Sequence, residues 1–263
     1  MPFAQLTELC RKNNILSCID GAHSTGGIPL NLLALDPDFY VSNCHKWLFV
    51  PRGCAIFYVA ERNHALMRST LPTSHGFVPL PTEEEEGEAK IPNPLPPSSK
   101  SDFVTAFEFV GTLDNSPFLS VPAALEWRKK LRWKDMSGEE AIYSYIAHNA
   151  HQAGEILASK FGTEVLDNEE KTLTNCFFSN VRLPLSFAND AHGSRDEAVK
   201  IAQWIAKVLV EEYDTFIAVI FYGDAWWVRL SGQVYLTEQD WEWAAEVLVG
   251  LCQGVRSGEW MDD

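Results

Sequence analysis

Residues 19–59 read IDGAHSTGGIPLNLLALDPDFYVSNCHKWLFVPRGCAIFYV, and the short apolar runs in and beside this stretch indicate the fold class. The run Ile15–Ile19 predicts a buried strand, and Phe39–Ser42 predicts a second strand; each leads into polar residues. A third strand is expected over Cys54–Val59. Buried strands that alternate with helices and end in polar residues are typical of an α/β sheet. Such sheets bind ligands at the carboxyl ends of their strands.

Four side chains capable of chemistry follow the first two strands: Asp20 and His23 after one, His45 and Lys46 after the other. Each alone has an ordinary explanation, since a lysine is usually exposed and an aspartate after a strand is commonly a turn residue. Two strand ends of a parallel sheet converge on one crevice, however, so we expect these groups to meet. A carboxylate, imidazoles and an amine close together perturb one another's pKa values, as the groups of functional sites do.

Helix and strand patterns continue on both sides of this stretch. Phe3–Cys10 carries apolar residues on one helical face and is followed by the polar run Arg11–Asn14. Residues 72–101 contain seven prolines and a glutamate run, and predict a long flexible loop. Helices are expected over Ser116–Leu131 and Gly138–Phe161. Further on, the patterns predict strands at Asn175–Leu183, Ile217–Tyr222 and Trp226–Leu230, and helices at Ser194–Tyr213 and Thr237–Cys252.

These patterns predict two domains. Residues 1–135 are expected to form the C-terminal part of a large α/β domain, with a mostly parallel sheet and the loop 72–101. Residues 136–263 are expected to form a connector helix followed by a small α+β domain, with its helices on one face of a sheet.

The composition excludes several classes of partner. The charge balance is 21 − 36 = −15, which argues against nucleic acid and against an anionic membrane surface, since both select basic patches. No apolar run has the length of a membrane span, and the first residues lack a signal-peptide core, so a cytoplasmic protein is expected. The six cysteines form no CxxC pair or metal-type cluster, and no metal site is predicted.

Part of the negative charge is concentrated in one short run. It consists of Glu83, Glu84, Glu85, Glu86 and Glu88. We interpret this run as a solvated acidic loop rather than as a cation-binding site.

Residues 19–59 resemble the core of the class V aminotransferases, which are pyridoxal phosphate (PLP) enzymes of fold type I. The family pattern is a strand ending in D-x-A-H/Q, an aspartate-containing strand, HK, and P-x-G. Here it is Asp20-Gly21-Ala22-His23, Asp38-Phe39, His45-Lys46 and Pro51-Arg52-Gly53. The resemblance continues through Phe109-Val110-Gly111-Thr112 and Val228-Arg229-Leu230-Ser231, so it covers nearly the whole chain.

The resemblance implies a role for each residue near the strand ends. Lys46 would form the Schiff base with PLP and then move the proton at the substrate Cα. Asp20 would pair with the pyridine nitrogen and keep it protonated, which makes the ring an electron sink. His23 would lie near the phenolic oxygen of the ring. Asn43 and His45 would help to hold the phosphate, although many desulfurases have a serine at the position of Asn43.

Two further elements match the family. Gly111-Thr112 corresponds to a loop that reaches the phosphate of the neighbouring subunit's cofactor, so the resemblance implies a homodimer; the alternative is a turn that only leads into a helix. Arg229 corresponds to the arginine that grips the substrate α-carboxylate, a task that suits its planar fork. The alternative for Arg229 is a surface arginine on an edge strand.

The resemblance also implies that the family's large domain begins before the position of Met1 and that a glycine-containing phosphate loop lies in that earlier part. Within the family, Ser69–Phe77, Asn93–Ser101 and Phe107–Arg128 resemble the fungal isopenicillin-N-epimerase-like subgroup. That subgroup includes the hercynylcysteine sulfoxide lyases of ergothioneine biosynthesis. The first hypothesis is therefore a PLP-dependent C–S lyase acting on a cysteine-conjugate sulfoxide. The alternatives are an epimerase or aminotransferase acting on another amino acid, and a catalytically incomplete fragment.

Overall fold

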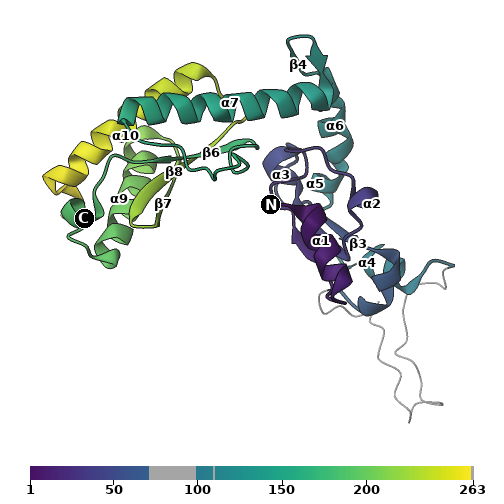
Figure 1. The fold of residues 1–263 in the computed structure, drawn as a ribbon. Coiled ribbons are helices and arrows are strands. Elements are labelled where there is room, and N and C mark those ends of the chain that lie inside the picture. Colours follow the sequence, from purple (N-terminus) through teal and green to yellow (C-terminus); the bar gives the residue numbers. More distant parts are fainter. Residues whose placement is uncertain (71–98, 109, 262–263) are drawn as a thin grey trace. The chain divides into compact units, whose positions relative to one another are not determined.

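The computed structural model describes residues 1–70, 99–108 and 110–261, which form two compact units, Met1–Trp127 and Arg128–Asp263 (Figure 1). The predicted flexible loop over 72–101 and its acidic run lie almost entirely outside the described residues. The assignment of a cofactor-binding domain to residues 1–135 and of a small domain to 136–263 stays a prediction.

The first unit contains a three-stranded sheet in the order β1-β2-β3. The strands β1 (Cys18–Asp20) and β2 (Phe39–Asn43) are parallel, whereas β3 (Ala55–Val59) is antiparallel to β2. The helical elements are α1 (Phe3–Lys12), α2 (Leu32–Leu35), α3 (Cys44–Trp47), η1 (Glu61–Leu66), α4 (Asp102–Glu108), α5 (Ser116–Leu119) and the first part of α6 (Val121–Lys130), which continues into the second unit.

The predicted strand over Ile15–Ile19 is wrong at its beginning. The strand starts at Cys18, and Ile15 and Leu16 are 59% and 55% exposed. An apolar run predicts burial only where a second layer covers it, and these two side chains have no such cover among the described residues. The helix predicted from Phe3 is confirmed as α1, but its Leu6 and Leu9 are exposed as well.

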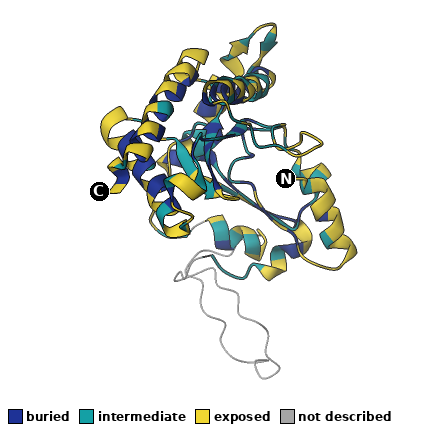
Figure 2. Cartoon of the chain, turned by 60° about the vertical axis from the view of Figure 1, so that its left-hand side comes forward, coloured by how far each residue is buried: buried dark blue, intermediate teal, exposed yellow. Residues whose placement is uncertain are grey.

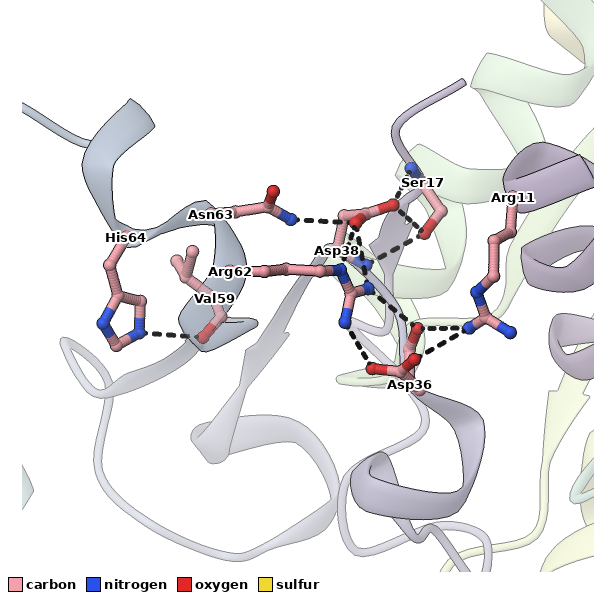
Figure 3. Close-up of polar contacts among 8 residues, drawn as sticks. All are labelled: Arg11, Ser17, Asp36, Asp38, Val59, Arg62, Asn63 and His64. Carbon is pink, nitrogen blue, oxygen red and sulfur yellow. Dashed lines mark hydrogen bonds and ion pairs between the residues drawn. The ribbon is translucent and has the colours of Figure 1, made fainter. Parts of the chain in front are cut away.

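Asp38, which lies between α2 and β2, connects three segments at the end of the sheet where β1 and β2 begin (Figure 3). Asp38 Oδ2 accepts from the backbone N–H and the hydroxyl of Ser17, at 2.8 and 3.0 Å. Its Oδ1 accepts from Asn63 at 2.8 Å and from Arg62 Nη2 at 2.9 Å. Arg62 also pairs with Asp36 at 2.6 Å. These bonds join the start of β1, the start of β2 and η1.

The second unit packs helices against the antiparallel sheet β6-β8-β7. Its strands are β4 (Arg132–Trp133), β5 (Met136–Ser137), β6 (Phe178–Arg182), β7 (Ala218–Tyr222) and β8 (Ala225–Ser231). Its helices are α7 (Gly138–Phe161), α8 (Phe187–Asp190), α9 (Arg195–Tyr213), α10 (Glu238–Ser257) and the short η2 (Glu259–Met261).

The long helices of this unit follow the sequence prediction because their ends carry clear signals. The helix predicted over Gly138–Phe161 is confirmed as α7, and Gly162 ends it in the left-handed conformation. Thr237 is the N-cap of α10, and its N–H donates to Asp240 Oδ2 at 2.7 Å. Fully buried residues such as Ile201 and Leu248 belong to one core that α7, α9 and α10 share with the sheet. Figure 2 shows helices with a buried stripe on one side and exposed residues on the other.

The single helix predicted over Ser116–Leu131 is wrong, because the structure has α5 and α6 with a break at Ser120. The break follows from Pro122, which lacks the backbone N–H that would bond to Phe118 in a continuous helix.

All six cysteines lie in the described residues and are free thiols. Among the described residues, no helix combines the length and the apolar character needed to cross a bilayer.

Candidate functional site

The parallel strands β1 and β2 end side by side, and the candidate site begins at these ends. Asp20, the last residue of β1, is in register with Val41. Gly21 N donates to Val41 O at 2.8 Å, so the pairing continues one residue beyond β1. The strand β2 leads directly into α3, which carries Lys46. Parallel pairing therefore brings the polar residues that follow β1 and β2 to the same end of the sheet, as the sequence predicts.

The turn after β1 is held by a series of hydroxyl groups around Tyr40. Ser24 Oγ lies 2.9 Å from Gly21 O, to which it can donate, and 2.7 Å from the Tyr40 hydroxyl. Tyr40 Oη lies 2.6 Å from Thr25 Oγ1, and in each hydroxyl pair either oxygen can be the donor. Gly21 O also accepts from Ser42 Oγ at 2.7 Å. A Cβ atom on Gly21 would lie 2.2 Å from the Tyr40 ring, so only glycine fits beneath it.

The same turn places His23 against α3. His23 Nε2 lies 3.4 Å from Lys46 Nζ, and its Nδ1 accepts from Trp47 Nε1 at 3.3 Å. Gly26 allows this close approach: its φ is +83°, and a Cβ atom there would lie 2.5 Å from the carbonyl oxygen of Trp47. The structure therefore brings together two of the predicted residues, His23 and Lys46, and adds Trp47 to them.

The other predicted cofactor ligands of this unit are Asp20, at the end of β1, and Asn43 and His45, which are close to Lys46 along the chain. Asp20 is exposed, and its Oδ1 accepts from Ala22 N at 3.0 Å, which fixes the orientation of the carboxylate. Asn43 is the N-cap of α3, but its side chain makes no capping hydrogen bond to the helix. His45 Nδ1 is buried and has no hydrogen-bond partner among the described residues. A buried polar atom without a partner is costly, so His45 Nδ1 is a candidate contact for a bound ligand.

The thiol next to the site is a packing group. Cys44 is 2% exposed and lies opposite Cys54, to whose carbonyl oxygen its N–H donates at 3.1 Å. Burial, followed by the hydrogen bond and the charge of Cys54, raises the pKa of the Cys44 thiol to about 12. Cys44 is therefore protonated at neutral pH and unsuited to nucleophilic attack.

Gly111 and Thr112 form part of the loop between α4 and α5. Gly111 has a φ of +101°, which requires glycine, and Thr112 is exposed. The adjoining Phe109, which belongs to the quoted motif, lies outside the described residues. The chain therefore bends at Gly111 and leaves Thr112 exposed.

Arg229 belongs to the second unit and is described there alone. It lies on β8, the central strand of the sheet, so it is not an edge-strand arginine. Its guanidinium carbon is 5.3 Å from the ring centroid of Phe178. Its Nε is buried without a hydrogen-bond partner among the described residues. A half-buried guanidinium with an unsatisfied donor is suited to binding a carboxylate.

Sequence reasoning missed Trp47, Gly26 and Tyr40, which hold His23 and its turn in place. The adjacency of Trp47 to the lysine was visible in the motif, but a pattern of residue types does not show which ring nitrogen an indole contacts. The pair Gly26-Gly27 signalled a close backbone approach without indicating its partner.

The aminotransferase class-V family profile matches residues 1–185. The chain belongs to the class V aminotransferase family. This family consists of PLP enzymes, which agrees with the cofactor predicted from the sequence.

Curated relatives extend the match to almost the whole chain. An L-cysteine desulfhydrase-like protein of Epichloe uncinata is 39% identical, over 98% of this chain and 60% of the relative. The hercynylcysteine sulfoxide lyase of Schizosaccharomyces pombe is 32% identical, over 95% of this chain and 55% of the relative. The chain thus spans a little over half the length of these two relatives.

Solved structures confirm the fold class. A cysteine desulfurase from Thermococcus onnurineus matches with a TM-score of 0.60 at 15% identity, over 96% of this chain and 56% of the other. The alanine–glyoxylate aminotransferase of a Nostoc species matches with a TM-score of 0.57 at 16% identity, over 97% and 57%. The chain therefore has part of the PLP fold type I architecture.

Proposed function

We propose that this chain carries the Lys46 half of the active site of a PLP-dependent C–S lyase. The observation that carries the proposal is the contact between Lys46 Nζ and His23 Nε2 at the shared end of two parallel strands. The Lys46 amine follows β2, and the exposed carboxylate of Asp20 ends the neighbouring strand β1. An amine and a carboxylate are two of the groups that a PLP site requires.

The residues present fit the cofactor. The buried Nδ1 of His45, which has no partner among the described residues, is a polar atom that a ligand would satisfy. Asp20 would hold the proton on the pyridine nitrogen, and His23 would face the phenolic oxygen. Asn43 and His45 would contact the phosphate. Bound PLP supplies an electron sink that acidifies the substrate Cα.

The chain's own residues would then perform two tasks on an amino-acid substrate. Arg229 would bind the α-carboxylate through its planar guanidinium. Lys46 would accept the proton from Cα, after which the sulfur substituent leaves from Cβ. The names of the relatives, a cysteine desulfhydrase-like protein and a hercynylcysteine sulfoxide lyase, support a sulfur-bearing substrate. We propose a cysteine-conjugate sulfoxide of the ergothioneine-pathway type.

A second candidate is an epimerase or aminotransferase, which the similarity to the isopenicillin N epimerase of Streptomyces clavuligerus favours, at 25% identity over 95% of this chain. Product analysis separates the candidates. A lyase releases pyruvate and ammonia, whereas an aminotransferase needs a keto-acid acceptor and an epimerase keeps all atoms of the substrate.

The proposal includes a homodimer and a cytoplasmic location. Thr112, which is exposed and follows a glycine with a positive φ, would donate its hydroxyl to a phosphate on a partner subunit. Six free thiols are typical of a reducing compartment.

The test is the visible absorption spectrum of the chain mixed with PLP and then desalted. We expect a band from lysine-bound cofactor in the wild type, and borohydride should fix the cofactor to Lys46, as located by peptide mass spectrometry. Lys46→Ala should abolish both signals, while Lys12→Ala, which changes an exposed lysine of α1 paired with Glu8, should leave both intact. Without a band in the wild type, the chain is the catalytically incomplete fragment and the proposal fails.

A further inference from the structure

We propose that Trp47 is a positioning residue that fixes the tautomer of His23 and so makes His23 a hydrogen-bond donor to the Lys46 amine. The functional meaning of this inference rests on the proposed role of Lys46. The geometry behind it does not, because it involves only contacts among residues of the first unit.

The argument starts at the indole. Trp47 is 3% exposed, and its Nε1–H can only donate. Its partner at 3.3 Å is His23 Nδ1, which must therefore be the unprotonated nitrogen of the ring. A doubly protonated imidazolium would place two N–H groups against each other here. A ring that accepts at Nδ1 carries its single proton on Nε2.

The second step concerns the lysine. His23 Nε2, which carries the proton, lies 3.4 Å from Lys46 Nζ. An ammonium has three donors and no acceptor, so it would meet the Nε2–H as a second donor. A neutral amine has a lone pair and can accept this hydrogen bond. The Nε2–H of His23 would thus be directed at the amine that attacks an aldehyde carbon or takes a proton.

The backbone makes this arrangement hard to relax. Lys46 and Trp47 are neighbours on α3, so the two nitrogens of one imidazole contact two consecutive residues. The turn that carries His23 is fixed against α3 at Gly26, where a Cβ atom would lie 2.5 Å from Trp47 O. The ring is held from both sides, and rotation about its χ2 angle would break both bonds.

The direct test is nitrogen NMR of the ¹⁵N-histidine-labelled chain without cofactor. The resonances of His23 are assigned by their loss in His23→Gln. We expect an unprotonated Nδ1 and a protonated Nε2 in the wild type, and a mixture of tautomers in Trp47→Phe, which keeps an aromatic ring but removes the N–H. An Nδ1–H tautomer in the wild type would overturn the inference, and so would a folded Trp47→Phe with unchanged resonances. The wild-type result stands even if Trp47→Phe does not fold.

The consequence for Lys46 is tested by acylation of the cofactor-free chain with a limiting amount of an amine-reactive ester. The rate at Lys46 is measured by peptide mass spectrometry relative to exposed Lys12. Loss of one neutral hydrogen bond should lower that ratio roughly two- to tenfold in Trp47→Phe and in His23→Leu. His23→Gln should keep the ratio near the wild-type value, because an amide can accept from Trp47 and donate to Lys46. An unchanged ratio in His23→Leu contradicts the inference.

These outcomes are separable from those of the proposed function. A chain that fails to bind PLP but shows the Nε2–H tautomer and the change in acylation contradicts the proposed function alone. A chain that binds PLP through Lys46 with the other tautomer contradicts the inference alone.

Discussion

The carboxylate of Asp38 accepts hydrogen bonds from several segments of the first unit. Burial by itself raises the pKa of Asp38, but hydrogen bonds from the Ser17 backbone, Asn63, Arg62 and the Ser17 hydroxyl outweigh it and lower the pKa from 3.8 to about 2. The charged form is thus stabilised by folding. This contribution is fully present above about pH 3.8, and it is lost as the pH falls toward 2.

Replacement of Asp38 by asparagine should therefore destabilise the first unit at neutral pH by about 2 kcal/mol, and by much less near pH 2. The measurement is urea unfolding at both pH values. Asp36→Asn is the matched control: Asp36 also pairs with Arg62 but its side chain is 43% exposed, so its loss should cost less than about 1 kcal/mol. Equal losses for the two variants at neutral pH would contradict this account.

The cysteines should differ sharply in reactivity. Cys18 is exposed, whereas Cys44, Cys54 and Cys252 are buried, and burial raises the pKa of Cys252 to about 12. Iodoacetamide at neutral pH should label Cys18 long before these three, which should react only after denaturation. Peptide mass spectrometry gives the order. Early labelling of Cys44 would contradict its assignment as a packing group.

At the scale of elements, the sequence predicted those whose ends carry chemical signals. The helix α7 ends at Gly162, and α10 begins at Thr237, both of which are recognisable caps. The start of β1 was not predictable in the same way, because the burial of Ile15 depends on what covers it. The break between α5 and α6 could have been predicted from Pro122, which lacks a backbone N–H.

Two glycines offer a contrast at this scale. Gly26→Ala should disrupt the turn that carries His23, because its φ is positive and the new Cβ would meet Trp47 O; we expect a loss of at least about 1 kcal/mol and slower acylation of Lys46. Gly250→Ala in α10 meets nothing within 4 Å among the described residues and should stabilise the second unit by about 0.5–1 kcal/mol. Chemical unfolding measures both changes in the free energy of unfolding. If Gly26→Ala leaves the stability of the first unit unchanged, the turn is not fixed at Gly26.

At the scale of the whole molecule, the two units differ in how well their apolar surface is covered. The first unit has a small buried cluster around Cys44, Leu48 and Val50, while Leu6, Leu9, Ile15 and Leu16 are exposed. The core of the second unit is far larger. Apolar surface left in water does not contribute to stability, so the second unit should be the more stable of the two.

Hydrogen exchange measured by mass spectrometry should show this difference directly. We expect the amides of α7, α9 and β8 to exchange slowest, and those of α1 and α2 to exchange orders of magnitude faster. Protection of α1 equal to that of α7 would contradict the expectation and would point to an added layer over α1, such as a second copy of the chain.

The fold could be predicted from the sequence more completely than the details of the candidate site. The family and the fold class could be predicted from residues 19–59. This stretch contains the strands, the polar residues that follow them and the lysine in the order that is typical of the family. The site followed only in part: Lys46 and His23 were expected to meet, but the hydrogen bonds of Trp47 and Asp38 depend on rotamers and on strand register, which no motif specifies.

The series of hydroxyls above Gly21 has a consequence for how this sequence can change over evolutionary time. Any side chain at position 21 collides with the Tyr40 ring, and a smaller residue at position 40 removes the phenol that links Ser24 with Thr25. Neither position can therefore drift by itself. We expect the two positions to covary among homologues, so that chains without glycine at position 21 also lack tyrosine at position 40. We also expect a double-mutant cycle of Gly21→Ala with Tyr40→Val to show strong coupling between the two changes in stability.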